Sequence, residues 1–341
     1  MRTSHLRVTA RAVHSLLRAG IPLVLFAVAA TALAADCVRP GDRLLLISTR
    51  PVGCTTDAPR LAEGIHAAEY ADGGWQTTPF DATVGSIDPT LPVIFYIHGN
   101  QIDSCEAPSR GRDVYRRLVR CAADDRPIQF VVFSWASGKV KGLLRDYREK
   151  AARTRPVAWQ LAWVLDRLPA GSQVGLIGYS YGARVSSGAA HLLAGGSLSG
   201  LRYDGCTTCG VTSMRAVFMA AAYDACWNSR RGYHRHTLDK IDTLLATVNP
   251  RDPAMKYYKW VPSYGDPPAL GGVGPKGLDA EQASRVRLKH VAGSVGRSHD
   301  LYDYLSTPGL MTSAWRRLTF SDAAPTPQLA AEPASDTVAQ R

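Results

Sequence analysis

One serine has the surroundings of a nucleophile. Ser180 lies in Gly178-Tyr-Ser-Tyr-Gly182, after a run of apolar residues and before a small-residue stretch of helical character. A nucleophilic serine needs a sharp turn from strand to helix, which lifts its hydroxyl above the sheet. Glycines two positions before and after it are required because a Cβ there would collide with the neighbouring strand and helix. The pattern predicts a nucleophile for acyl transfer; the alternative is a serine that only shapes a turn.

Acyl transfer also needs donors for the oxygen that becomes negative. The helix start after Ser180 offers the backbone N–H of Tyr181. A second donor is expected where an apolar strand ends in His98-Gly99-Asn100, because the glycine lets the chain turn the amide of Asn100 toward the serine. His98 itself is expected to be a packing residue, since the base must approach from the far side of the nucleophile.

The expected base is His299, in a polar loop after the last predicted strand. His290 falls inside that strand and is expected in the core. Three other histidines precede any acid placed after the next-to-last strand and are expected to be structural: His191, His234 and His236.

The first candidate for the acid is Asp252, in the turn Asn249-Pro-Arg-Asp-Pro253. Asp224 follows the preceding strand and remains an alternative, because hydrolases take the acid from either place. Asp300 is expected to cap the following helix. The order serine, aspartate, histidine is that of an α/β-hydrolase, and such a triad requires neither metal nor cofactor.

Aromatic residues are expected to shape the substrate site. Tyr179, Tyr181 and Trp135 are predicted beside the serine. The Gly- and Pro-rich insert Met255–Gln282 carries four more aromatic residues: Tyr257, Tyr258, Trp260 and Tyr264. This insert is either a lid or an ordinary surface loop. A lid would indicate a moderately apolar acyl or aryl ester.

The elements that must position these residues alternate along the chain. Seven apolar runs predict strands at Arg43–Ser48, Pro92–Ile97, Ile128–Phe133, Gln173–Ile177, Met214–Ala220, Thr243–Val248 and Val286–Val291. Helical patterns lie between them at Asp113–Ala122, Val157–Leu168 and Tyr181–Leu193. Alternation of this kind predicts an α/β fold, with a mainly parallel central sheet and helices on both faces.

The N-terminus predicts export. Four arginines precede the uncharged run Ile21–Ala34, which ends in the small-residue pattern of a cleavage site. An uncleaved anchor is the alternative, but these 14 residues fall short of the roughly 20 that cross a bilayer. We therefore expect a signal peptide at 1–34, a hydrolase domain at 35–320, a flexible tail at 321–341, and a periplasmic or secreted protein.

The charge of the mature chain and its cysteines fit an exported protein. Removal of the leader would lower the net charge from +11 to +7, because the leader holds four arginines and no acids. The basic segment Lys139–Arg155 is either a solvated helix face or a surface that attracts an anionic envelope. Export makes nucleic acid an unexpected partner, and no stable protein partner is predicted. All seven cysteines follow the leader, at positions 37, 54, 105, 121, 206, 209 and 226. In an exported protein we expect them to form disulfides, for example Cys37 with Cys54 and Cys105 with Cys121.

From about Arg43 to Leu305 the chain resembles an α/β-hydrolase. It is similar to a group of exported bacterial predicted serine esterases in which strands end in His-Gly-Asn and Phe-Ser-Trp before GxSxG; here these are His98-Gly99-Asn100, Phe133-Ser134-Trp135 and Gly178 to Gly182. The resemblance implies the fold, Ser180 as nucleophile and His299 as base, and less firmly Asp252 as acid. It implies no substrate beyond a small-molecule ester. A non-catalytic binding protein of the envelope and an acyltransferase with the same triad remain alternatives.

Overall fold

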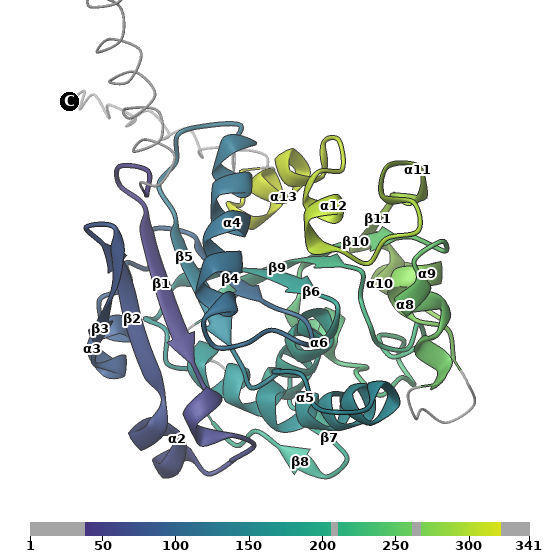
Figure 1. The fold of residues 1–341 in the computed structure, drawn as a ribbon, viewed down its shortest axis with the longest axis horizontal. Helices are drawn as coiled ribbons and strands as arrows, with labels where there is room; N and C mark the ends of the chain where they lie inside the picture. The colour runs from purple at the N-terminus through teal and green to yellow at the C-terminus, as the bar shows by residue number, and fades with distance from the viewer. Residues whose placement is uncertain (1–37, 206–210, 261–266, 322–341) are drawn as a thin grey trace, which may run out of the picture.

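A nine-stranded sheet forms the centre of the protein. A computed structural model describes residues 38–205, 211–260 and 267–321 (Figure 1). The strand order is β11-β10-β9-β6-β4-β5-β1-β2-β3, and the seven strands from β11 to β1 run parallel. The predicted α/β class with a mainly parallel sheet is therefore confirmed. The strands are β1 (Arg43–Ser48), β2 (His66–Ala71), β3 (Gly74–Thr78), β4 (Val93–Ile97), β5 (Gln129–Ser134), β6 (Ser172–Tyr179), β9 (Val211–Met219), β10 (Thr243–Val248) and β11 (Val286–His290).

Two strands of the sheet and a small hairpin were not predicted. β2 and β3 pair antiparallel at one edge, and β7 (Ser197–Leu198) pairs with β8 (Leu201–Arg202). β2 has the sequence HAAEYA, which lacks the branched residues typical of strands. Its turn did carry a signal, because Asp72-Gly73 has positive φ at both positions and favours a tight hairpin.

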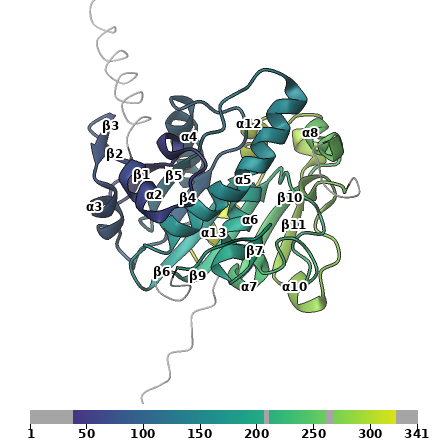
Figure 2. The same cartoon turned by 90° about the horizontal axis from the view of Figure 1, so that it is seen from below.

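Helices cover both faces of the sheet, as Figures 1 and 2 show. Alternate residues of β4 enter two separate hydrophobic clusters, because successive side chains of a strand point to opposite faces. Helices α5 (Leu143–Leu165) and α6 (Tyr181–Leu193) pack in one cluster, α4 (Glu106–Arg120) and α13 (Leu310–Leu318) in the other. The shorter helices are η1 (Arg50–Val52), α2 (Ala58–Gly64), α3 (Phe80–Gly85), α7 (Thr237–Lys240), α8 (Pro253–Lys256), η2 (Tyr258–Trp260), α9 (Leu270–Val273), α10 (Ala280–Ser284), α11 (Ala292–Val295) and α12 (Leu301–Leu305).

Helix α5 is longer than the sequence predicts. It begins 14 residues before the predicted start at Val157 and continues through Pro156. The expectation that the charged residues of this segment form a wholly solvated face is wrong, because Asp146 and Lys150 are buried and form an ion pair of 3.3 Å. The pair lies within α5, and Asp146 also accepts hydrogen bonds from the side chains of Asn100 and Gln101, which fasten the first turns of the helix to the loop after β4.

The predicted disulfide between Cys105 and Cys121 is also wrong. These residues lie at opposite ends of α4, whose 15 residues span about 22 Å, whereas the Cα atoms of a disulfide lie within about 7 Å. Within the described ranges, Cys54, Cys105, Cys121 and Cys226 are free thiols. The other three cysteines fall outside those ranges. Because Cys37 is one of them, the expected pair of Cys37 with Cys54 is not described.

The ends of the chain fall largely outside the description. The expected leader at 1–34 is not described, nor is the expected tail at 321–341 except for Ser321. No helix in residues 38–205, 211–260 and 267–321 combines the length and apolar character of a membrane span.

Candidate active site

Ser180 occupies a strained turn between β6 and α6. Its backbone has φ 53° and ψ −119°, a conformation that residues with a side chain rarely adopt. The turn is held from below, since the N–H of Ser180 donates to the carbonyl of Met219 at the end of β9 (2.9 Å). A strained residue that its surroundings hold in place is a common feature of catalytic sites.

The two flanking glycines are needed for space. A Cβ on Gly182 would lie 1.9 Å from the carbonyl oxygen of Ile97, and one on Gly178 would lie 2.5 Å from the Cα of Ala183. Both neighbours are backbone atoms, which cannot rotate aside. The structure thus gives the physical reason that the sequence pattern predicted.

The turn presents Ser180 to His299, and His299 to Asp252. The Nε2 of His299 lies 3.1 Å from the hydroxyl oxygen of Ser180, and its Nδ1 lies 2.7 Å from Oδ2 of Asp252. Asp252 follows β10 and caps α8, whereas His299 lies in the loop before α12. The structure therefore brings together three residues that are separated by up to 119 positions in the sequence.

The Asp252 carboxylate is completely buried but has hydrogen-bond donors on both oxygens. The backbone N–H of Ala254 donates to Oδ1 (2.8 Å), and the hydroxyl of Tyr304 donates to Oδ2 (2.7 Å). Burial and the negative charge of Asp252 raise the pKa of Tyr304, so its hydroxyl stays protonated as a donor. These donors fix the carboxylate against the imidazole. Tyr304 was not singled out from the sequence; only its nearness to His299 in the chain hinted at a role.

Asp224, the alternative acid, lies elsewhere. Its Oδ1 accepts a hydrogen bond from the hydroxyl of Tyr258 (2.7 Å), and that hydroxyl also accepts from Arg184 (3.3 Å). His299 has its hydrogen bond with Asp252 instead. Of the two candidate acids, the structure brings only Asp252 to the histidine.

The two expected oxyanion donors lie at the serine. Tyr181 is the first residue of α6, and the loop of Gly99 and Asn100 follows β4. A Cβ on Gly99 would lie 3.1 Å from the Cβ of Ser180, so this loop lies directly against Ser180. Among the described residues, no hydrogen bond uses the backbone N–H of Tyr181 or Asn100. Both amides remain available to an oxyanion.

The Asn100 side chain fixes this loop. Its amide nitrogen donates to Oδ2 of Asp146 (2.6 Å), and the side chain of Gln101 donates to the same oxygen (3.0 Å). The buried Asp146–Lys150 pair of α5 therefore also positions the loop. The role of Asp146 could not be predicted from the sequence, because Asp146 is one of many charged residues in this segment.

Two expected substrate-contacting residues are structural instead. Trp135 is fully buried, stacks on His98 (ring centroids 5.6 Å apart) and donates its indole N–H to the carbonyl of His98 (2.9 Å). The expectation that it overhangs the serine is wrong. Tyr179 is buried, and its hydroxyl donates to the backbone carbonyl of His299, so it positions the base rather than walls the cavity. Burial and the nearby Arg50 lower the pKa of His98 to about 3, which fits a neutral packing residue.

A cavity of about 400 Å³ opens above Ser180 and His299. Its walls are mainly apolar and come from the start of α5, the start of α6 and the α8–η2 segment. The lining residues are Leu143, Leu144, Tyr147, Ser180, Tyr181, Ala222, Pro253, Ala254, Met255, Tyr257, Tyr258, Trp260 and His299. The first residues of the Gly- and Pro-rich insert thus contribute part of the wall, while its Tyr264 lies outside the described residues.

A scan of the sequence against protein-family models finds no match, and no curated protein is significantly similar to it.

Proposed function

We propose that this protein is a serine hydrolase of the α/β-hydrolase type that cleaves carboxylic esters. One observation carries the proposal: Ser180, His299 and Asp252 form a continuous chain of hydrogen bonds at a strained strand-to-helix turn beneath an apolar cavity. A nucleophile, its base and the group that orients the base are the three parts that acyl transfer requires.

The mechanism follows from these contacts. His299 takes the proton of Ser180 through Nε2 as the serine oxygen attacks the ester carbonyl. Asp252 keeps the proton of the imidazole on Nδ1 and stabilises the imidazolium that forms. The amides of Tyr181 and Asn100 bind the oxyanion. His299 then protonates the leaving alcohol, and water, activated by the same imidazole, releases the acyl group.

The cavity supports a moderately apolar acyl or aryl group as substrate. Its walls offer Leu143, Leu144, Met255 and several aromatic rings, but few charged groups. We infer that the first residues of the insert, from Met255 to Trp260, cover the site, because they line the cavity together with residues of α5. The leader pattern at 1–34 supports action outside the cytoplasm.

The test is covalent labelling of the purified protein with a fluorophosphonate, which reacts with activated serines. Labelling is expected in the wild type and absent in Ser180→Ala. Ser187→Ala is the matched control, because Ser187 lies on the same helix and also contacts a histidine. A folded wild-type protein that does not label would reject the hydrolase and favour a binding protein; labelling with acyl transfer to an added alcohol rather than to water would indicate an acyltransferase.

A further inference from the structure

Exposed apolar side chains gather at the mouth of the cavity. Seven large apolar residues of the described chain are exposed, and four of them line this cavity. Leu143 and Leu144 begin α5, whereas Tyr257 and Trp260 lie on the α8–η2 segment. These four, which we call the collar, are 46% to 64% exposed. An apolar cluster of this kind on a protein surface indicates a site of interaction.

The aromatic half of the collar is preformed. The rings of Tyr257 and Trp260 stack with centroids 4.8 Å apart, and both residues are exposed. Tyrosine and tryptophan favour the boundary between water and lipid, because each has an apolar body and a polar tip.

Cations flank the collar residues in the chain, and the Nζ of Lys256 lies 5.8 Å from the ring centre of Tyr257. Six Lys and Arg side chains at the start of α5, just before it and on the α8–η2 segment are exposed. Within the part of the chain described they form no ion pair: Lys139, Lys141, Arg145, Arg148, Lys256 and Lys259. The carboxylates of these stretches are engaged elsewhere. Asp146 pairs with Lys150, Glu149 with Arg153, and Asp252 with His299. The two segments that carry the collar are therefore both apolar and positively charged.

We propose that the collar and its cations dock the protein on a lipid surface with anionic headgroups. The cations would contact the phosphates while the collar enters the region just below them. A second copy of the chain is a poor occupant, since a symmetric dimer through the collar would place six cations against six. Docking would hold the cavity over the ester bonds of the lipids; this last step rests on the proposed function, whereas docking itself does not.

The experiment measures binding of the Ser180→Ala protein to vesicles by flotation, so that no lipid is hydrolysed. Vesicles of phosphatidylglycerol and phosphatidylcholine are compared with phosphatidylcholine alone. Binding is expected only to the anionic vesicles and should weaken with added salt. Loss of one cation, as in Lys256→Gln or Lys259→Gln, should weaken binding about fivefold. Trp260→Ser should weaken it about tenfold.

Matched controls lie on β11, away from the cavity. Leu288→Ser removes an exposed apolar side chain and Arg287→Gln an exposed cation, and neither should alter binding. No binding to anionic vesicles, or equal losses in the controls, would overturn docking. A dimer in solution that Trp260→Ser dissociates would assign the collar to a second copy instead. Fluorophosphonate labelling of the wild type is a separate readout, so docking and the proposed hydrolase can fail independently.

Discussion

Two serines contact histidines, one in the turn before α6 and one within that helix, and only one pair has the surroundings for catalysis. Ser180 and His299 lie 3.1 Å apart, and Ser187 and His234, about two turns further along, lie 2.9 Å apart. Distance alone would favour the second pair. Yet Ser187 and His234 are buried, and none of the described cavities is lined by either.

The environment of His234 prevents it from acting as a base. Burial and the nearby His191 and Arg184 lower its pKa well below the usual range, so it does not accept a proton near neutral pH. The hydroxyl of Ser187 is also occupied, because it accepts from the side chain of Asn228 (3.1 Å) and bonds with Thr237 (3.0 Å). A serine–histidine contact therefore needs a carboxylate behind the imidazole and a cavity in front of the serine.

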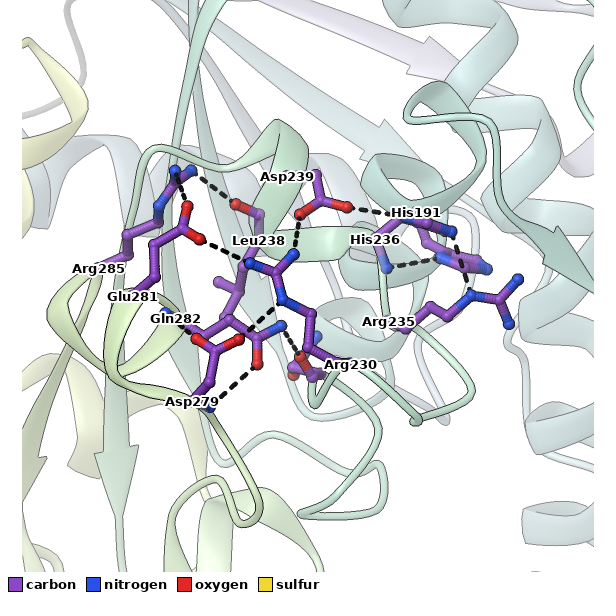
Figure 3. Close-up of polar contacts among 11 residues, drawn as sticks. His191, Arg230, Arg235, His236, Leu238, Asp239, Asp279, Glu281, Gln282 and Arg285 are labelled. Carbon is purple, nitrogen blue, oxygen red and sulfur yellow. Dashed lines mark hydrogen bonds and ion pairs between the residues drawn. The ribbon is translucent and has the colours of Figure 1, made fainter.

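A third site has the carboxylate but lacks the serine. His236 and Asp239 form a pair of 2.8 Å that resembles His299 and Asp252 in length. Figure 3 shows that Asp239 also binds Arg230, which reaches Asp279 and Glu281. This exposed network ties α7 to α10. A histidine–carboxylate pair is thus structural where it lacks a nucleophile.

The largest expected difference is between the two histidines. His299→Ala should lower kcat for ester hydrolysis by about 10⁴-fold or more, because the serine loses its base. His234→Gln should leave kcat within about twofold and lower the free energy of unfolding, because it disturbs only a buried network. Steady-state hydrolysis of a p-nitrophenyl ester and urea unfolding measure the two effects. Equal losses of kcat would contradict the assignment.

The next largest difference in kcat is expected between variants of the two candidate acids. Asp252→Asn should reduce kcat by about 10⁴-fold, because an amide stabilises the wrong tautomer of His299. Asp224→Asn keeps an acceptor for the Tyr258 hydroxyl and should change kcat less than about fivefold. The same assay tests both. If Asp224→Asn proved the more damaging, the acid would have to be reassigned.

These contrasts show what the sequence could predict of the fold. β1 and β10 have the predicted bounds because their residues are apolar and buried. In the edge hairpin, β2 is rich in alanine and β3 is mostly polar, and the first half of α5 is also mostly polar, so none of them has the hydrophobic pattern that predicts an element. All three are held by contacts with distant residues.

Some residues of the site could likewise be predicted from the local sequence, and others could not. The segment Gly178 to Gly182 predicts its own turn, because its requirement is local and steric. The hydrogen bond from Tyr304 to Asp252 spans 52 positions, and Trp135 packs on His98, which is 37 positions away in the sequence. Such roles depend on the packed fold and leave no local signal.

A smaller effect is expected at Tyr304. Tyr304→Phe removes the donor to Asp252 and should lower kcat about tenfold with little change in KM, because it loosens the carboxylate rather than the substrate. Tyr302→Phe is the matched control two residues away, since its hydroxyl donates to the exposed Asp113. A fall in both variants would point to a general disturbance of α12.

The smallest expected effect is on the free energy of unfolding at low pH, where the buried histidines take up protons. Burial lowers the pKa of His191 to about 4, whereas an unfolded histidine titrates near pH 6.5. The folded state then binds fewer protons than the unfolded state. The stability from this group is complete above about pH 6.5 and is lost as pH falls toward about 4, by up to about 1.4 kcal/mol per pH unit. Urea unfolding from pH 7.5 to 5 should show a shallower dependence on pH in His191→Gln than in the wild type. His290 ends β11 but is exposed, so the expectation that it lies in the core is wrong. His290→Gln is the control and should keep the wild-type slope. If His191→Gln keeps that slope too, the protons bind elsewhere, and His191 would not be the neutral packing residue that its burial indicates.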